Sequence, residues 1–354
     1  MRALVTGGAG FIGAHVVRAL LAEGVDVRVL HLAGEDLSNL QGLECERLPG
    51  DVRDPATLGP AVRSCDWVFH LAALYALWTA DPERMRQVNV EGTRNVLRAA
   101  ADAGARKVVH TSTIAVFGGQ GLDRDATEQS PFRLADSGDP YCLTKYEAHQ
   151  VALEFARSGL DVSIVAPCGP IGPGDVGPTP TGRFLLAAVR WPISVCVHTI
   201  VNFVDVRDVA AGHVAAARRG RRGESYLLGA ENRTYRELLA TCHRLAGVWR
   251  PVVPVPGAIA SIGGSVLTFW ADHVSGRAPL FTRAVAKLYG HGLRADASKA
   301  ARELELTPRP VDIAVRDALR WFAERGYLGS GRLRQRLLDR LGESGLEPTT
   351  GSAP

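Results

Sequence analysis

The chain has 354 residues, of which 46% are hydrophobic and 22% charged, the composition of an ordinary soluble protein with one large or two modest domains. Its net charge of +4 is small, and its Arg-rich clusters at 218–222 and 332–340 lack aromatic or motif context, so we expect no nucleic-acid partner. The six cysteines show no Cys-x-x-Cys spacing and no signal peptide precedes the first apolar run, which favours a reducing, cytoplasmic location and no metal site.

Short apolar runs alternate with longer amphipathic ones over the first 170 residues, as in a parallel sheet whose strands are joined by helices. We therefore predict an α/β fold, a Rossmann-like doubly wound parallel sheet. Residues 1–166 should form a dinucleotide-binding domain, completed by segments near 200–215. The expected strands cover residues 2–6, 26–31, 44–48, 67–70, 107–112 and 162–166.

A Pro/Gly-rich segment, 167–182, ends this alternation. It is too long for a simple connection in a compact domain, so we expect it to be functional. Residues 167–330 should form a smaller, mixed and mainly substrate-binding region. Within it we expect helices near 184–189, 235–246 and 259–270, and a strand at 202–206.

The stretch 253–271 is the most apolar of the chain. Prolines and glycines interrupt it, and it lacks the roughly 20 apolar helical residues that cross a bilayer, so we expect a helix over a cleft and no membrane partner. Residues 331–354 should form a basic helix and a disordered tail, because the end of the chain lacks apolar periodicity.

A glycine pattern follows the first expected strand directly and opens a helix. Gly7 would permit a tight turn, Gly10 would let backbone N–H groups approach a pyrophosphate, and Gly13 would let helix and strand pack closely. The start of the helix, with Phe11 and Ile12, would face the anion with N–H groups and partial positive charge. The pattern predicts a dinucleotide site.

The second expected strand ends with His31 and Leu32, where NAD-binding proteins place a carboxylate for the adenosine ribose. Neither a carboxylate nor an arginine stands there, and Arg28 and His31 are the candidates for contact with a 2′-phosphate. We therefore favour NADP(H) slightly over NAD(H) as the cofactor.

Further cofactor contacts are expected at the carboxyl ends of the third and fourth strands, since ligands of parallel sheets collect there. Asp51 and Val52 follow the third strand, and Leu71, Ala72 and Ala73 follow the fourth. Judged without the glycine pattern, Asp51 is as readily a turn or N-cap residue as a cofactor ligand.

Tyr141 and Lys145 are one helical turn apart, about 5 to 6 Å between Cβ atoms, and Pro140 suits the first turn of their helix. Hydride transfer to a carbonyl needs a proton donor, and a tyrosine beside an ammonium can be that general acid or base. Working near neutrality requires a phenolate stabilised by roughly three pKa units, about 4 kcal/mol. The spacing is common in helices, so the glycine pattern upstream is what favours a catalytic pair.

A hydroxyl near the end of the fifth strand would hold the substrate oxygen and the tyrosine in line. We predict that Thr113 has this role, with Ser112 as the second candidate. The alternative is that both hydroxyls merely cap the end of the strand.

Together these features resemble the extended short-chain dehydrogenases/reductases over residues 1–330. Besides the glycine pattern and the tyrosine–lysine pair, the likeness includes 51–52, 70–73, Asn89 and the Thr113 region. Within that family the chain most resembles the hopanoid-associated sugar epimerases, themselves similar to dihydroflavonol reductases. This closer likeness is carried by residues 73–78, 88–95, 170–175, 178–183 and 202–210.

The resemblance implies that Asn89 positions Lys145 through a bound water and that Pro167 lies beside the nicotinamide. It also leaves a homodimer open.

Two departures argue against nucleotide-sugar chemistry. Epimerases of UDP-sugars usually have an asparagine and an arginine where this chain has Ala166 and Val201, and without a cation a diphosphate loses its natural partner. The 4,6-dehydratases have an Asp-Glu pair where this chain has Ile114 and Ala115, so we do not expect dehydration by that route.

The sequence therefore predicts a reversible oxidoreductase acting on a secondary alcohol or ketone of a small organic substrate. Two alternatives stay open: an epimerase that returns the hydride to the opposite face of a transient ketone, and a cofactor-binding protein without turnover. We expect an apolar or aromatic substrate pocket, although its aromatics could equally serve in the core. Its expected members are Tyr75, Leu77, Trp78, Arg183, Phe184 and residues of the 253–275 helix.

Overall fold

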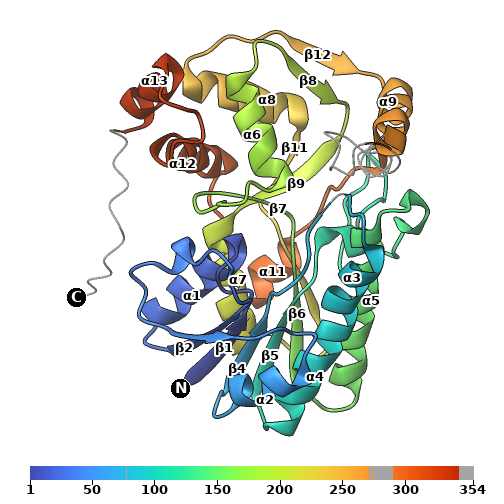
Figure 1. The fold of residues 1–354 in the computed structure, drawn as a ribbon. Coiled ribbons are helices and arrows are strands. Elements are labelled where there is room, and N and C mark those ends of the chain that lie inside the picture. The colour runs from blue at the N-terminus through green and yellow to red at the C-terminus, as the bar shows by residue number, and fades with distance from the viewer. Residues whose placement is uncertain (77, 271–273, 275–289, 343–354) are drawn as a thin grey trace.

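The computed structural model describes residues 1–76, 78–270, 274 and 290–342 (Figure 1). Among these residues, the centre is a seven-stranded sheet of order β10-β6-β5-β4-β1-β2-β3 in which all neighbours are parallel. The strand order reverses beside β1, so the predicted doubly wound, Rossmann-like fold is confirmed. The strands are β1 (Arg2–Thr6), β2 (Asp26–His31), β3 (Glu46–Pro49), β4 (Trp67–His70), β5 (Lys107–Thr111), β6 (Val162–Pro167) and β10 (Ser225–Leu228).

Helices cover both faces of this sheet, because each connection between parallel strands crosses over it. On one face α1 (Phe11–Ala22) packs against α7 (Val206–Arg219). On the other face α4 (Gly92–Asp102) lies between α2 (Pro55–Val62) and α5 (Pro140–Arg157). Shorter helical segments are η1 (Ser38–Leu40), α3 (Pro82–Arg86), η2 (Gln87–Glu91), η3 (Ile114–Val116) and η4 (Ala135–Ser137).

Alternate side chains of the central strands supply two separate cores. In β1, Ala3 and Val5 join the core beneath α1 and α7, whereas Leu4 joins the core beneath α2, α4 and α5. All three are fully buried. A strand buried on both faces has no polar side to alternate with, which explains why these strands are continuous apolar runs in the sequence.

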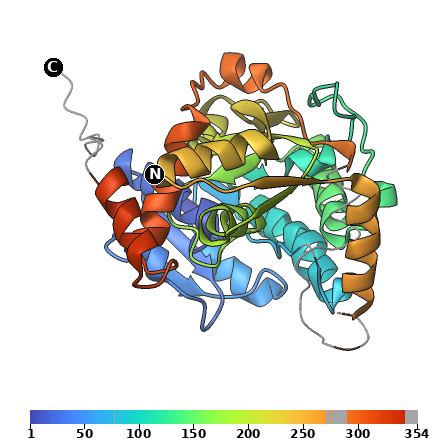
Figure 2. The same ribbon diagram turned by 90° about the horizontal axis from the view of Figure 1, so that it is seen from above.

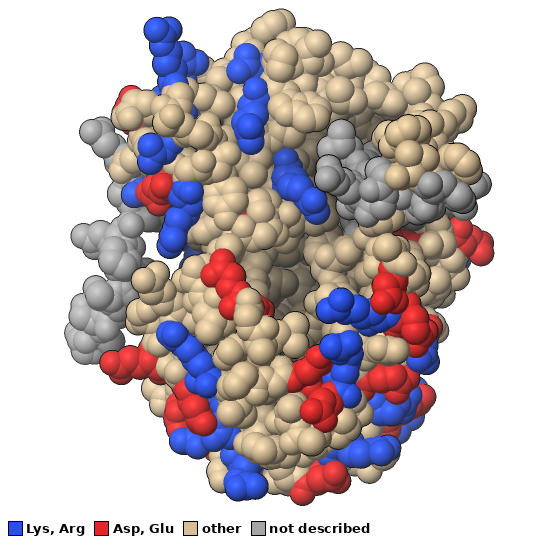
Figure 3. Space-filling view, viewed as in Figure 1, with Lys and Arg blue, Asp and Glu red and all other residues tan. Residues whose placement is uncertain are grey.

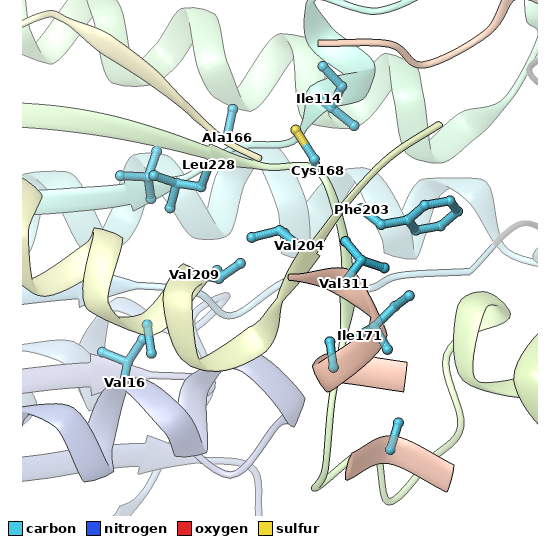
Figure 4. Packing of buried hydrophobic residues seen from close by; sticks show 14 of the residues in the cluster. Val16, Ile114, Ala166, Cys168, Ile171, Phe203, Val204, Val209, Leu228 and Val311 are labelled. Atoms are coloured by element: carbon cyan, nitrogen blue, oxygen red, sulfur yellow. The ribbon is translucent and has the colours of Figure 1, made fainter. Parts of the chain in front are cut away.

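The core beneath α1 and α7 continues into the smaller region of the protein (Figure 4). It extends from Val16 of α1 and Val209 of α7 to Ile171, Phe203 and Val311. Protein interiors are close-packed, so a shared core fixes the position of the smaller region relative to the sheet.

The smaller region is mixed in topology (Figures 1 and 2). β9 (Ile200–Asp205) is parallel to β7 (Gly169–Ile171) and antiparallel to β11 (Glu231–Thr234). A separate parallel pair is formed by β8 (Ser194–Val197) and β12 (Val252–Val255). The remaining described helices are α6 (Pro180–Arg190), α8 (Tyr235–Ala246), α9 (Gly257–Trp270), α11 (Ser298–Glu303), α12 (Val311–Glu324) and α13 (Arg332–Leu341).

The strands expected at 2–6, 26–31 and 67–70 are found with those bounds, whereas the third strand begins at Glu46 rather than at residue 44. The Pro/Gly-rich segment 167–182 contains a strand that was not predicted, β7, whose residues pair with β9. Four further strands were not predicted: β8, β11 and β12 of the smaller region, and β10 at the edge of the seven-stranded sheet.

The helix expected at 235–246 is confirmed by α8. Most of the tail, 343–354, lies outside the described residues, as does much of the segment after α9. Within the part of the chain that is described, no helix combines the length and the apolar character needed to cross a bilayer.

Candidate active site

A cleft of about 640 Å³ lies between the carboxyl edge of the seven-stranded sheet and the smaller region, which is a volume typical of small-molecule sites. Figure 3 shows a hollow between the two halves of the protein. Parallel strands end together at this edge, so residues distant in sequence meet there. The predicted site residues that line the cleft are Gly7, Gly10, Phe11, Ile12, Gly13, His31, Asp51, Val52, Leu71, Ala72, Ala73, Tyr75, Ser112, Thr113, Tyr141, Lys145, Pro167 and Arg183.

The glycine turn closes on the start of α1 and leaves no room for side chains. Gly7 has a left-handed backbone (φ +68°), and a Cβ on it would lie 2.8 Å from the backbone nitrogen of Ala72. A Cβ on Gly13 would lie 2.1 Å from the carbonyl oxygen of Gly7. The N-cap of α1 is Gly10, so no capping side chain stands between the cleft and the first N–H groups of the helix at Phe11. This bare helix start fits the pyrophosphate of a dinucleotide.

His31, Asp51 and Val52 line another part of the cleft. Nδ1 of His31 lies 2.9 Å from the carbonyl oxygen of Leu32, so Nδ1 carries a proton and Nε2 is an acceptor in the neutral ring. Arg53 donates to the Asp51 carboxylate through its guanidinium and its backbone N–H, and this pairing lowers the pKa of Asp51. Asp51 therefore stabilises the turn that follows β3, by accepting from the N–H of Arg53, and also lines the cleft.

Arg28 was a candidate for contact with a 2′-phosphate, and this expectation is wrong. Its guanidinium donates to Glu46 and to three backbone carbonyl oxygens at the end of α2, where a cation stabilises the helix terminus. Two carboxylates that were not predicted, Glu35 and Asp36, line this part of the cleft instead. Glu35 accepts a hydrogen bond from the backbone N–H of Leu32. Both lie in the loop after β2, where strand patterns give no signal.

The start of α5 is set by strong local signals. Asp139 accepts hydrogen bonds from two N–H groups of the first turn, and Pro140 takes the first helical position. This start brings Tyr141 and Lys145 to the cleft on one side of the helix. Nζ of Lys145 donates to the carbonyl oxygen of Thr111 at 2.6 Å, and burial lowers the pKa of Lys145 to about 8.

Burial raises the pKa of Tyr141, and a hydrogen bond with Thr113 opposes part of this rise. Lys145 is not among the groups that shift the pKa of Tyr141, and its ammonium donates to the Thr111 carbonyl instead. The ring of Tyr75 packs on that of Tyr141, with centroids 4.7 Å apart and planes at 52°. The phenol is therefore protonated and held between an aromatic ring and a hydroxyl.

Asn89 lies in a π-helical turn, η2, between α3 and α4, and π turns are frequent at functional sites. It does not line the cleft. Its Oδ1 accepts from the N–H of Leu74, and its Nδ2 donates to the Leu74 carbonyl and to the hydroxyl of Thr144. Because Thr144 directly precedes Lys145 in α5, Asn89 ties the segment after β4 to the helix that carries the predicted catalytic pair.

A directed chain of hydrogen bonds supports this turn. Thr93 donates its hydroxyl proton to the carbonyl oxygen of Asn89, so it accepts from Nε2 of His70, 2.9 Å away. Nδ1 of His70 then accepts from the hydroxyl of Thr6, whose oxygen accepts from the N–H of Ala72. Burial lowers the pKa of His70 to about 3, so the ring is in the neutral form that the chain requires.

The Pro/Gly-rich segment is bound to the glycine side of the cleft. Nδ2 of Asn39 donates to the carbonyl oxygen of Ala9, in the glycine turn, and to that of Gly174. Nε2 of His15, in α1, donates to the carbonyl oxygen of Pro173 at 2.8 Å. The two sides of the cleft are therefore joined by side chain to backbone hydrogen bonds as well as by the shared core.

The expected substrate residues are only partly brought to the cleft. Tyr75 and Arg183 line it, whereas Trp78 and Phe184 do not. Phe184 instead packs on Tyr235 in the core, with ring centroids 4.6 Å apart. Leu77 lies outside the described residues, and no described residue of α9 lines the cleft, so this helix does not cover it.

Several residues that line the cleft were not predicted as part of the site. Many follow the ends of β5 and β6, so the rule that ligands collect at carboxyl ends of strands was the signal that could have found them. They include Thr111, Ile114, Ala115, Cys168, Pro170, Asp175, Val201, Tyr235 and Leu293.

A family model described as NAD dependent epimerase/dehydratase family matches residues 3–229. The chain belongs to this family. A Synechocystis protein assigned provisionally as a dihydroflavonol 4-reductase is 39% identical over 92% of this chain and 95% of its own length. The 4-hydroxy-2-methyl-3-oxo-4-farnesyl-3,4-dihydroquinoline-1-oxide ketoreductase of Stigmatella aurantiaca is 33% identical over 95% of this chain and 100% of its own. The crystal structure of gox2253 is similar with a TM-score of 0.82 and 38% identity, covering 92% of this chain and 98% of that one.

The resemblance to the extended short-chain dehydrogenases/reductases is therefore confirmed, and this member of the epimerase/dehydratase family is an NAD(P)-binding enzyme. The family model covers β1 to the end of β10, which includes all seven strands of the large sheet and the segment 167–182. The glycine turn, Asn89, Thr113, Tyr141 and Lys145 fall within this range.

Gly13→Ala should weaken binding of NAD(P)H at least about tenfold, or 1.4 kcal/mol, because the added Cβ would displace the Gly7 carbonyl and with it the turn. Fluorescence titration of the purified protein with NADPH and NADH measures this loss. Gly59→Ala, in α2, is the matched control, since a Cβ there has nothing within 4 Å and binding should be unchanged. Full affinity in Gly13→Ala would contradict the role of the turn.

Proposed function

We propose that the chain is an NAD(P)-dependent oxidoreductase that interconverts a ketone and a secondary alcohol of a small, apolar organic substrate. The observation that carries the proposal is that Tyr141, Thr113 and Lys145 line the same cleft as the glycine turn. A phenol and a hydroxyl at this place can hold a carbonyl oxygen and supply it with a proton. NAD(P), when bound, would exchange a hydride with the carbon of that carbonyl.

In the direction of reduction, Tyr141 would donate its phenolic proton to the substrate oxygen, with Thr113 holding that oxygen in line. Burial supports this direction, because a raised pKa keeps Tyr141 in the protonated form that a general acid needs. Oxidation of an alcohol would need Tyr141 as the phenolate. Lowering the pKa of a tyrosine by three units, from about 10 to near neutrality, requires about 4 kcal/mol of stabilisation of the phenolate. Lys145 and the charge of an oxidised nicotinamide would have to supply it.

Tyr141→Phe should reduce the rate of ketone reduction to less than about one tenth, since general acid catalysis contributes 10²- to 10⁴-fold. Binding of NADPH should be retained, because the ring and its packing on Tyr75 remain. Initial rates with a panel of ketones, followed by NADPH absorbance, measure the effect. Tyr146→Phe is a control on the same helix, since Tyr146 stacks on Phe132 and does not line the cleft. More than a tenth of the rate in Tyr141→Phe, or no turnover by the unchanged protein with any substrate, would overturn the assignment.

The rate of reduction should fall as the pH rises through about 8. Below that pH Lys145 is protonated, and above it the ammonium is lost, because burial lowers its pKa to about 8. A pH profile of kcat/KM should therefore show a descending limb near pH 8. Lys145→Arg keeps the charge at all accessible pH values and should lack this limb even if its rate is lower. A limb that persists in Lys145→Arg would assign it to another group.

For the cofactor we propose a slight preference for NADP(H). Support comes from the end of β2, where His31 and Leu32 stand in place of a carboxylate, and from Arg53 at the same part of the cleft. The carboxylates of Glu35 and Asp36 disfavour a 2′-phosphate in this part of the cleft. His31 can donate from Nε2 to a phosphate only when its ring is doubly protonated. A small rather than a strict preference follows from this balance.

The ratio of kcat/KM for NADPH and NADH should lie above one for the unchanged protein, as measured with one ketone at saturating concentration. His31→Asp should shift this ratio towards NADH by about tenfold or more, since a carboxylate accepts from ribose hydroxyls and repels a 2′-phosphate. A preference of the unchanged protein for NADH of more than tenfold would refute the proposal.

The apolar lining of the cleft favours an apolar substrate, since Ile114, Val201 and Leu293 are part of it. The Stigmatella relative is a ketoreductase of a farnesylated dihydroquinoline oxide, which is a substrate of that kind. A sugar nucleotide would find Val201 and the fully buried Ala166 where UDP-sugar epimerases usually have an arginine and an asparagine.

An epimerase is the second candidate, since the matching family includes epimerases. It would use the same tyrosine and leave the total amount of NAD(P)H unchanged. Chiral chromatography of a secondary alcohol after incubation with a catalytic amount of NAD(P) distinguishes the two activities.

A further inference from the structure

Exposed apolar side chains gather on one part of the smaller region. Among the described residues, twelve of the fifteen exposed large hydrophobic side chains belong to the range 191–274. They lie on or beside α9 and the paired strands β8 and β12, and β12 leads directly into α9 (Figures 1 and 2). Single exposed apolar residues are normal on a protein surface, but a concentration of this kind marks an interaction surface.

α9 turns its large side chains outwards, which reverses the pattern of an ordinary surface helix. Its buried residues are the small Ala260 and Gly264. At about 100° per residue, the exposed large side chains fall within an arc of about 160°. They are Ile259, Ile262, Val266, Leu267, Phe269 and Trp270.

The strand pair beside α9 is also apolar on its exposed side. Val195 and Val253 are partners in the register of β8 and β12, and both are about half exposed. Trp191 and Trp249 lie next to these strands, 53% and 83% exposed. We call residues 191–195, 249–253 and 259–270 the apolar rim.

The apolar rim lacks negative charge. No Asp or Glu occurs in 176–204 or 238–271, although the chain has 37 of them. The same stretches contain four arginines, and two of these, Arg190 and Arg250, directly adjoin the exposed Trp191 and Trp249. Figure 3 shows the corner around α9 without acidic or basic side chains. Among the described residues, the rim itself is thus apolar and carries no carboxylate, and the charged residues that adjoin its tryptophans in sequence are Arg190 and Arg250.

We propose that the apolar rim docks on the surface of an anionic phospholipid membrane, with α9 lying along the boundary between headgroups and acyl chains. The exposed arc of α9 provides the apolar face for this position, and tryptophans favour this boundary. Arg190 is exposed and Arg250 is partly exposed next to these tryptophans, so both side chains would be within reach of lipid phosphates.

The length of α9 fixes how it meets the lipid. Its 14 residues are about 21 Å long, less than the roughly 30 Å of a bilayer core, so it lies in the plane of the surface and does not cross it. Such a peripheral contact departs from the sequence-based expectation of no membrane partner, which rested on the lack of a segment long enough to cross a bilayer. A second copy of the chain fits the rim less well, because across a two-fold contact its arginines would meet arginines with no carboxylate to pair them.

Co-sedimentation of the full chain with lipid vesicles tests the proposal independently of catalysis. The protein should bind vesicles of phosphatidylglycerol, and more weakly vesicles of phosphatidylcholine. The double variant Ile262→Glu/Val266→Glu should bind phosphatidylglycerol vesicles at least about tenfold more weakly, since both side chains are more than 60% exposed and would enter the lipid. Gln41→Glu/Gln129→Glu adds the same charge at exposed positions elsewhere and should bind like the unchanged protein.

Thermal unfolding and NADPH titration of each variant establish that the fold is intact, which is expected for changes at exposed positions. The proposal is overturned if the unchanged protein stays in the supernatant with both lipids, or if Ile262→Glu/Val266→Glu binds as well as the control variant. It is also overturned if analytical ultracentrifugation shows a dimer that only the rim variant loses, since the rim would then be the contact between two copies. None of these outcomes depends on turnover.

Discussion

The whole site depends on the contact between the start of α1 and the end of β1. At Gly13 the helix comes so close to the Gly7 carbonyl that no side chain can intervene. This contact sets the place of the bare helix start, and it also sets the position of the rest of α1, which packs on α7 and carries His15. Through the shared core and the bond from His15 to the smaller region, one close backbone approach at the N-terminus determines the shape of both walls of the cleft.

One chain of buried hydrogen bonds under the cleft has a single consistent placement of its protons. The chain from Ala72 through Thr6, His70 and Thr93 to Asn89 is satisfied only with a neutral His70 protonated at Nε2. Burial favours that neutral ring, so electrostatics and hydrogen bonding agree. The arrangement connects the end of β1, the end of β4 and the π turn, which in turn bonds to Thr144 of the helix that carries Tyr141 and Lys145.

Much of the fold could be predicted from the sequence because a parallel sheet buried on both faces leaves continuous apolar runs, and because glycines at fixed spacing mark the first turn. The two residues predicted as a catalytic pair, Tyr141 and Lys145, both line the cleft. Prediction from the sequence failed for residues whose partners come from distant parts of the chain. Arg28 donates to carbonyl oxygens at the end of α2, Phe184 packs in the core, and the ammonium of Lys145 donates to a strand carbonyl. Short strands such as β7 also escape prediction, since three residues carry no periodicity.

Asn39 has a consequence for attempts to change which molecules the protein accepts. Its single amide group holds a carbonyl of the glycine turn and a carbonyl of the Pro/Gly-rich segment at once. In a chimera that takes the Pro/Gly-rich segment from a relative, the backbone at position 174 would come from the relative, whereas the amide of Asn39 that binds it would be unchanged. A graft should therefore keep both hydrogen bonds of Asn39, or transfer residue 39 together with the segment. Substrate specificity can then be changed without disturbing the glycine turn that binds the dinucleotide.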